Sequence, residues 1–266
     1  MTLVDALGCE HAFARPPQRI VSLVPSITET LFALGAGSAL VGATDYCVHP
    51  GDELADVPRV GGTKNADVER IRALRPDLVL ANKEENRRRT VEQLQAASIP
   101  VFVTYPRTVH SALEDIAMLG RLLERPGPAA VVVERIEQAW VRARERATDS
   151  PLAVAALIWK GPYMAVGGDT FADALLAEAG ARNVFAGAGS RYPRIETEAL
   201  AAAAPEVILL PTEPYAFGEA DRVELLALDC PAARDGRIHV VEGELLSWYG
   251  PRIARALDVF SSLFAP

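Results

Sequence analysis

The chain has 266 residues, of which 50% are hydrophobic and 23% charged, enough to bury one large core or two medium ones. Its formal net charge of −8 argues against nucleic acid as a partner, because proteins that bind nucleic acid cluster Lys and Arg. No apolar run approaches the roughly 20 residues that a transmembrane helix needs.

Short runs of β-branched residues alternate with segments of helical periodicity, which is typical of α/β units with parallel strands. The first strand is predicted at residues 19–24, and Pro25 ends it. Residues 26–29, with the sequence Ser-Ile-Thr-Glu, then fit a capping box that opens a helix closed by Gly35. Further strands are predicted at residues 40–43, 77–81, 100–104, 153–159, 207–210 and 238–241, with helices between them.

A long helix is predicted in the middle of the chain. Residues 129–148 contain no Gly or Pro, and apolar residues recur among them at helical spacing. Such a helix would be roughly 30 Å long, about the width of a lobe. We therefore predict two α/β lobes, residues 1–125 and 150–266, joined by a stiff linker helix at residues 126–149. The alternative is a crossover helix within one larger sheet.

An internal repeat supports two related halves. Residues 67–80 and 196–209 share the layout of a helix, a Pro followed by an acidic residue, and a buried strand. Glu69 and Glu198 occupy matching positions near the N-terminus of each predicted helix, where the helix dipole favours a carboxylate. Capping alone would explain either Glu, and the shared register indicates a common surface role at least as strongly.

Catalytic and metal-binding signatures are scarce. The sequence has no P-loop, no GxSxG, no HExxH and no GxGxxG after a strand. The odd count of Cys9, Cys47 and Cys230 argues against a disulfide framework, and no CxxC pattern is present. Cys47 and His49 lie two residues apart and could ligate a metal or form a nucleophile pair, but this spacing is weak evidence. We predict no catalytic residue and no metal site.

Loops at the carboxyl ends of strands hold the ligands of open α/β sheets, and here several such loops carry aromatic or cationic side chains. Aromatic residues make up only 6% of the chain, yet most of its Tyr and Trp residues fall in these loops. Rigid rings and a few cations suit a large planar or anionic ligand. The residues predicted to contact the ligand are Pro25, Ser26, Tyr46, Thr63, Lys64, Asn82, Lys83, Trp159, Tyr163, Tyr192, Trp248, Tyr249 and Arg252.

Taken together, these features resemble the substrate-binding proteins of cobalamin, haem and ferric-siderophore ABC importers, also called helical-backbone metal receptors or class III periplasmic binding proteins. The resemblance covers nearly the whole chain and is carried by residues 5–8, 17–23, 25–29, 69–79, 198–208 and 251–253. It implies two Rossmann-like lobes with central parallel sheets, joined by one long rigid α-helix, with the ligand between the lobes. The cobalamin-binding type looks most similar, and by that similarity the cleft would be lined by Tyr46, Thr63, Asn82, Tyr163 and Tyr192.

The resemblance also implies a non-enzymatic function. A metal chelate, either a corrinoid such as cobalamin or a ferric siderophore, would be bound without an intrinsic cofactor and delivered to an ABC importer by a monomer. Glu69 and Glu198 stand where the family docks against arginines of the membrane permease, a contact that mainly steers and orients the complex. Thr63 and Asn82 stand where cobalamin binders often carry Trp, so the surface for stacking on a corrin is thinner here.

The beginning of the chain bears on where the protein acts. Residues 1–15 carry two acids and a His and lack an apolar core, so they do not form a secretory leader. We expect the chain as written to stay in the cytoplasm, and to act in the periplasm or at the cell surface if a leader precedes it. The alternative function is that of a cytoplasmic relative with a more polar ligand. It would be a metal-handling enzyme that uses Cys47, His49 and Lys83, or a sensor in which Glu69 and Glu198 contact a soluble partner.

Overall fold

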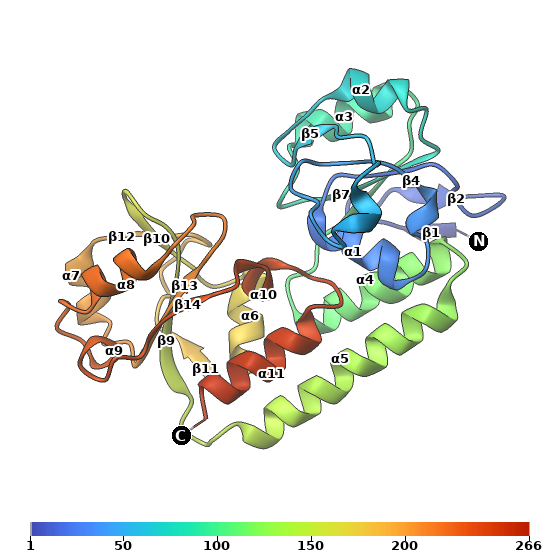
Figure 1. Cartoon of the computed structure of the whole chain (residues 1–266). Coiled ribbons are helices and arrows are strands. Elements are labelled where there is room, and N and C mark those ends of the chain that lie inside the picture. The colour runs from blue at the N-terminus through green and yellow to red at the C-terminus, as the bar shows by residue number, and fades with distance from the viewer. Residues whose placement is uncertain (1, 266) are drawn as a thin grey trace. The chain divides into compact units, whose positions relative to one another are not determined.

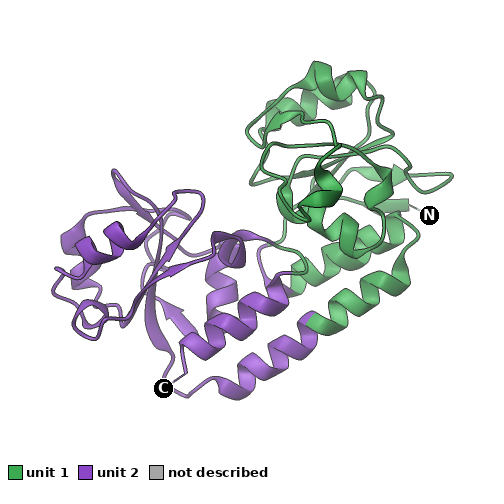
Figure 2. Cartoon of the chain, in the orientation of Figure 1, with its two compact units in different colours: residues 1–106, 110–135, 249–251 green, residues 107–109, 136–248, 252–266 purple. Residues whose placement is uncertain are grey.

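The computed structural model describes residues 2–265 and divides the chain into two compact units (Figure 1 and Figure 2). Met1 and Pro266 lie outside the described residues. Two tripeptides belong to the opposite unit from the residues on either side of them in the sequence, 107–109 to unit 2 and 249–251 to unit 1. Unit 1 comprises Met1–Pro106, His110–Arg135 and Tyr249–Pro251, and unit 2 comprises Arg107–Val109, Ile136–Trp248 and Arg252–Pro266.

Unit 1 is built on a four-stranded parallel sheet with the strand order β4-β3-β7-β8. Strands β3, β7 and β8 are buried along their whole length, as expected of parallel strands that helices cover on both faces. Two short antiparallel pairs, β1–β2 and β5–β6, also belong to this unit. The strands are β1 (Thr2–Val4), β2 (Glu10–Ala12), β3 (Ile20–Ser22), β4 (Leu40–Ala43), β5 (Gly61–Gly62), β6 (Asn65–Ala66), β7 (Leu78–Asn82) and β8 (Val101–Thr104).

The helices of unit 1 lie between these strands, with α1 against β3 and α3 against β8. The α-helices are α1 (Pro25–Ala33), α2 (Val68–Ala73), α3 (Arg88–Ala96) and α4 (Val109–Leu122), and the 3₁₀ helices are η1 (Gly37–Ala39) and η2 (Asp52–Leu54).

The capping box predicted at residues 26–29 is wrong. Helix α1 begins at Pro25 with Val24 as its N-cap residue, so Ser26 is the second helical residue. Proline suits the first position because an N–H there would have no partner within the helix. The Thr28 hydroxyl donates to the Val24 carbonyl oxygen at 3.2 Å and takes no part in a capping box.

The long helix predicted in the middle of the chain is α5 (Pro126–Arg146). It begins before residue 129 because Pro126 and Pro128 fit the first helical turn. Its residues are counted in unit 1 up to Arg135 and in unit 2 from Ile136 onward.

Unit 2 contains a six-stranded sheet in the order β12-β10-β9-β13-β14, with β11 also paired to β9. Strands β9, β13 and β14 are parallel, as predicted, and so is β11, which was not predicted. Strands β10 and β12 are antiparallel, so this sheet is mixed. Only residues 160–162 join β9 to β10, and so short a connection returns the chain as a hairpin. The strands are β9 (Leu152–Trp159), β10 (Tyr163–Ala165), β11 (Ala181–Asn183), β12 (Arg194–Ile195), β13 (Val207–Pro211) and β14 (Ile238–Val241).

Four helices of unit 2 contact this sheet, α6 at β11, α8 at β14 and both α9 and α10 at β13, while α11 packs on α6 and α10. The helices of this unit are α6 (Phe171–Glu178), α7 (Thr197–Ala202), α8 (Glu219–Leu225), α9 (Pro231–Arg234), α10 (Gly243–Ser247) and α11 (Ile253–Leu263). Within residues 2–265, none of the helices combines the length and apolar character needed to cross a bilayer.

The second half of α5 is held to unit 2 by hydrogen-bonded charges. Arg142 donates to both carboxylate oxygens of Asp258 on α11, at 3.0 and 2.7 Å. The Trp140 indole N–H and the Arg144 guanidinium both donate to Glu178 on α6, at 2.5 and 3.0 Å. Planar two-point contacts of the Arg142 kind fix geometry as well as charge.

The internal repeat is confirmed in the backbone. In each unit a two-residue strand, β6 or β12, leads into a six-residue helix, α2 or α7. The helix ends two residues before a residue with φ of 47°, Arg75 in one unit and Ala204 in the other. This left-handed residue turns the chain out of the helix and into the buried strand that follows, β7 or β13.

The acidic residue of each repeat fixes the beginning of a neighbouring strand. Asp77 accepts hydrogen bonds from the backbone N–H groups of Gln18 and Arg19, at 2.8 and 2.9 Å, just before β3. Glu206 accepts one from the backbone N–H of Ala153, at 2.8 Å, at the start of β9. The Pro-acid pairs recognised in the sequence therefore have a structural function in both units.

Candidate functional site

Three loops at the carboxyl edge of the unit 1 sheet are tied together by Asn86. Its side-chain N–H₂ donates to the backbone carbonyls of Leu23, after β3, and of Thr63, between β5 and β6, at 3.1 and 3.0 Å. Its side-chain oxygen accepts from the backbone N–H of Asn82, at the end of β7, at 2.8 Å. Asn86 is buried. The sequence analysis missed this residue, because an Asn in a polar loop carries no signal of the segments that it joins.

Four residues of the predicted site are buried in their units: Pro25, Ser26, Asn82 and Trp248. Asn82 is 1% exposed, and its side-chain oxygen accepts from the backbone N–H groups of the second and third residues after it. Trp248 is 5% exposed, and its indole N–H donates to Glu213 at 2.8 Å. Burial and these hydrogen bonds show that the Asn82 and Trp248 side chains support their loops, while direct contact of the four residues with a ligand stays a prediction.

The exposed predicted residues of unit 1 surround the same sheet edge. Tyr46, shortly after β4, is 63% exposed. Lys64 donates to the backbone carbonyl of Glu84 at 2.5 Å, which links the β5–β6 turn to the loop after β7. The Lys83 ammonium lies 4.8 Å from the ring centroid of Tyr105, which follows β8. Loops after three of the four strands therefore contribute an aromatic or cationic group to one edge.

The tripeptide 249–251 belongs to this edge although it lies far along the chain. The Tyr249 hydroxyl donates to Glu85 at 2.8 Å. Gly250 lies against α1 so closely that a Cβ atom there would be 2.7 Å from the Thr30 hydroxyl oxygen and 3.0 Å from the Ser26 carbonyl oxygen. Only glycine permits this approach. Tyr249 is thus placed by its neighbour's lack of a side chain.

In unit 2, two aromatic rings lie at the carboxyl ends of β9 and β13. Trp159 is 43% exposed, and its ring meets that of Tyr215 in an edge arrangement with 5.8 Å between centroids. Tyr215 in turn packs on Phe217, at 4.6 Å. Tyr215 was absent from the predicted set, although it follows the strand predicted at residues 207–210. The rule that selected the other loops would have found it.

Lys160 and Tyr163, on the turn between β9 and β10, are engaged by two acids of α8. The Lys160 ammonium donates to Asp221 and Glu224, each at 2.7 Å, and the Tyr163 hydroxyl donates to Glu224 at 2.9 Å. The hydrogen bonds from Lys160 lower the pKa of Asp221 and of Glu224, while they raise the pKa of Lys160 itself. Burial, and then the bond to Glu224, raises the pKa of Tyr163 to about 12.

The remaining predicted residues, Tyr192 and Arg252, lie beside other side chains of unit 2. The guanidinium of Arg191 is 5.9 Å from the Tyr192 ring centroid, and that of Arg252 is 5.0 Å from the ring of Trp248. Both predicted residues are half-buried. The structure thus gives each of them a packed neighbour and a partly exposed surface.

Cys47 is unsuited to the chemistry that its spacing from His49 suggested. Its side chain is fully buried, and Sγ lies 3.1 Å from the hydroxyl oxygens of Thr28 and Thr44. Burial raises the pKa of the Cys47 thiol, which disfavours the nucleophilic and metal-binding thiolate. Across residues 2–265, no three His, Cys, Asp or Glu side chains converge to hold a metal ion.

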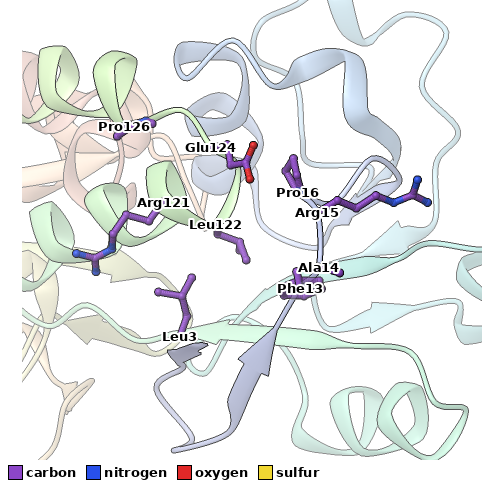
Figure 3. A pocket seen from close by; sticks show the side chains of 9 residues that line it. All are labelled: Leu3, Phe13, Ala14, Arg15, Pro16, Arg121, Leu122, Glu124 and Pro126. Atoms are coloured by element: carbon purple, nitrogen blue, oxygen red, sulfur yellow. The ribbon is translucent and has the colours of Figure 1, made fainter. Parts of the chain in front are cut away.

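A cavity of about 550 Å³ in unit 1 lies apart from these loops. Its lining includes Leu3, Phe13 and Leu122, and Figure 3 shows the side chains of Arg15 and Arg121 directed to opposite sides of it. None of its lining residues belongs to the loops after β3, β4, β7 or β8. Ligand sites usually combine an apolar wall with convergent polar groups, and these arginines do not converge.

Glu69 and Glu198 are equivalent in the structure. Each is the second residue of its helix, α2 or α7, and each is exposed. Glu69 accepts from Arg72 at 3.0 Å, and Glu198 accepts from the Thr197 hydroxyl at 3.2 Å. The two carboxylates therefore sit at one register position of the repeat, with different local partners.

The chain is similar to known binding proteins in both sequence and structure. Over 249 residues the chain is 26% identical to the vitamin B12-binding protein of Photorhabdus laumondii, covering 93% of this chain and 88% of that protein. A solved periplasmic heme-binding protein of Pseudomonas aeruginosa is 30% identical with a TM-score of 0.80, covering 94% of this chain and 93% of that one. A second, from Roseiflexus sp. RS-1, is 27% identical with a TM-score of 0.80, covering 93% and 97%.

The chain also matches a protein family over most of its length. Residues 20–224 match the family described as periplasmic binding protein, and they include strands of both sheets and the whole of α5. This confirms the resemblance found in the sequence, the α/β fold, and the prediction of a binding protein and not an enzyme. The chain belongs to the periplasmic binding protein family.

Proposed function

We propose that the chain captures a metal chelate of the corrinoid or porphyrin type, or a ferric siderophore, and delivers it to an ABC importer. The observation that carries this proposal is the exposure of two large aromatic rings, Tyr46 and Trp159, at the carboxyl ends of β4 and β9. Large aromatic rings that are exposed at the carboxyl edge of an α/β sheet suit a ligand with a flat ring system. The vitamin B12-binding and heme-binding relatives support the same class of ligand.

The proposed ligand surface consists of the predicted residues that keep exposed or half-buried side chains, together with Tyr215. Pro25, Ser26, Asn82 and Trp248 position the loops that carry them. The members of the surface are Tyr46, Thr63, Lys64, Lys83, Trp159, Tyr163, Tyr192, Tyr215, Tyr249 and Arg252.

The test uses the intrinsic fluorescence of the three Trp residues. Trp140 and Trp248 donate to carboxylates, whereas Trp159 presents its ring to solvent. Titration with cyanocobalamin, dicyanocobinamide, haemin and ferrichrome, corrected for inner-filter absorption and checked by calorimetry, should give saturable quenching by at least one chelate. The Trp159→Phe variant should lose most of that quenching, and Trp140→Phe should keep it.

The affinity change is equally specific. Trp159→Ala should weaken binding about 10-fold, which corresponds to about 1.4 kcal/mol, within the range for loss of one aromatic contact. The thermal midpoint should fall only slightly, because the ring is 43% exposed and loses mainly its contact with Tyr215. Absence of binding across the panel, or undiminished affinity in Trp159→Ala together with Tyr46→Ala, would refute this ligand surface.

We further propose that Glu69 and Glu198 contact basic residues of the importer permease, as their shared register and exposure suggest. In cells that import the ligand, Glu69→Arg with Glu198→Arg should lower uptake more than 10-fold without changing the Kd of the purified protein. Glu137→Arg, an equally exposed reversal on α5, is the control. Equal uptake by the double variant and the control would remove this role.

The organisation predicted from the sequence is part of the proposal. Residues 1–125 and 150–266 would act as the two ligand-binding lobes and residues 126–149 as their connection, in a monomer that light scattering would verify. The family description favours the periplasm. The cytoplasmic location expected for the chain as written remains a prediction, and fractionation of cells that express the natural gene tests it.

A further inference from the structure

A carboxylate-rich network borders the aromatic pair of unit 2. Lys160 adjoins Trp159 in the chain, and its ammonium lies 2.7 Å from one oxygen of Asp221 and 2.7 Å from one of Glu224. Tyr163 completes the network through its bond to Glu224. We call Lys160, Tyr163, Asp221 and Glu224 the carboxylate rim. Side chains of α8 thereby reach the turn between β9 and β10.

The carboxylate rim carries a net negative charge at neutral pH. It contains one cation and two anions, and the lowered pKa of each carboxylate keeps both ionised. The raised pKa of Tyr163, about 12, keeps its phenol protonated and donating to Glu224. The ammonium of Lys160 is already committed to two partners, so it offers little attraction to a further anion.

Several other cations near the proposed ligand surface are also engaged. In unit 1, Lys64 donates to a backbone carbonyl and Lys83 lies over the Tyr105 ring, while two neighbouring acids, Glu84 and Glu85, balance their charge. In unit 2, Arg107 and Arg191 both lie beside Asp169, and Arg252 lies over the Trp248 ring. The cations named here are therefore already balanced or packed and offer little attraction to an anionic ligand.

We propose that the carboxylate rim makes this chain select chelates whose periphery ends in neutral amides, such as corrinoids, over chelates that carry carboxylates, such as haem with its two propionates. This inference rests on the proposed function and names the ligand class within it. A carboxylate brought against Asp221 and Glu224 meets like charges as both lose water, and such contacts suppress the wrong partner. A neutral amide can donate to the same oxygens, so the rim attracts one periphery and repels the other.

The test compares two ligands that share a metal and a ring. Dicyanocobinamide ends in amides and dicyanocobyrinic acid in carboxylates, and haemin serves as a second carboxylate ligand. Calorimetry should give dicyanocobinamide a Kd at least 10-fold lower than that of either carboxylate ligand. Glu224→Gln should reduce this ratio of Kd values at least 3-fold, and Asp221→Asn with Glu224→Gln should reduce it further. Lys160→Gln, which removes the cation, should widen it.

The matched control is Glu219→Gln, which removes the same charge from the same helix but outside the rim, where Glu219 pairs with Arg222. It should leave the ratio unchanged, and thermal midpoints verify that each variant is folded. Equal shifts in Glu219→Gln and Glu224→Gln, or a wild-type protein that prefers carboxylate ligands, would overturn the selectivity. Failure to bind any of the three ligands would overturn the selectivity alone if another chelate such as ferrichrome binds, and the proposed function as well if none does.

Discussion

The two units repeat one backbone pattern but secure it with different chemistry. In unit 1 the carboxyl edge is organised by neutral amides, with Asn86 and Asn82 bonded to backbone groups of several loops. In unit 2 the corresponding edge is organised by charges, with Lys160 held between two acids of α8. The backbone repeat thus fixes where the loops emerge, while the side chains of each unit decide what the loops present.

The two units also differ at the N-terminus of the repeated helix, α2 in unit 1 and α7 in unit 2. Asp67 caps α2 by accepting from the backbone N–H groups of Glu69 and Arg70, at 3.0 and 3.1 Å. Glu196 holds the N-cap position of α7, where the described residues show no such side-chain bond. One additional methylene moves the carboxylate of Glu out of the geometry that Asp provides. Equal charge at equal register therefore does not imply equal stabilisation.

Among the variants that test this difference between the units, Asn86→Ala should lower the free energy of unfolding most. It removes three hydrogen bonds and leaves buried backbone groups of three loops without their partner, so the free energy of unfolding should fall by about 3 kcal/mol. Urea unfolding followed by circular dichroism measures the loss. Gln95→Ala, an exposed amide on α3, is the control and should change stability little. A cost near zero for Asn86→Ala would mean that the loops are held by packing alone.

A smaller and more direct comparison comes from the acids that begin β3 and β9. Asp77→Ala removes two charge-assisted bonds and should cost about 2 kcal/mol, whereas Glu206→Ala removes one and should cost about 1 kcal/mol. Both are measured by denaturant unfolding under one set of conditions. An equal cost in the two variants would show that the second amide of the Asp77 contact adds nothing.

The attachment of α5 to the two units should differ in its response to pH. In unit 1, Gly120 lets α4 approach Ala129 of α5 so closely that a Cβ atom at Gly120 would lie 2.4 Å from that of Ala129. In unit 2, the hydrogen bonds from Arg142 lower the pKa of Asp258 below its usual value. The first contact does not titrate, whereas the second does.

Asp258→Asn should therefore cost about 1.5 kcal/mol at pH 7. Because the folded pKa is the depressed one, the stabilisation is complete above the unfolded value of about 4 and is lost as the pH falls through the folded pKa. Thermal midpoints of wild type and variant should converge in acid. A difference that persists at pH 2 would assign the effect to packing, and Glu137→Gln on α5 controls for net charge.

The smallest effect concerns the helix caps. Asp67→Ala should destabilise the protein by about 1 kcal/mol, the usual cost of losing an N-cap side chain, while Glu196→Ala should change stability by about zero. Both positions are exposed, so the comparison is free of burial. A similar cost for both replacements would mean that the helix dipole, and not the cap bond, determines the contribution.

Much of the fold could be predicted because local sequence patterns determine its helices and strands. The buried strands β7, β8 and β13 are continuous apolar runs, and the Pro-acid pairs at residues 76–77 and 205–206 mark where helices end and strands begin. The start of α1 was predicted wrongly, because the Ser and Glu spacing fits a capping box as well as it fits the interior of a helix that begins at Pro25. The antiparallel β10 and β12 were missed, because two- and three-residue strands carry too little pattern to assign a direction.

The surroundings of the candidate site residues were harder to predict than the fold, for a physical reason. Loop residues can be selected from the sequence by their position after strands, and Tyr46 and Trp159, selected in this way, are exposed. Whether a selected side chain faces water depends on contacts with distant segments, and Trp248 is buried because Glu213, 35 residues away, accepts its N–H.

The sequence by itself determined the α/β pattern, the repeat and the family, because strand periodicity, helix length and the Pro-acid pairs act over a few residues at a time. Only the tertiary structure decided which loops meet, that Asn86 ties three of them, and that Lys160 lies between Asp221 and Glu224 some 60 positions later. Hydrogen bonds and charge pairs form between groups that folding brings within about 3 Å, and separation along the chain carries no record of that distance.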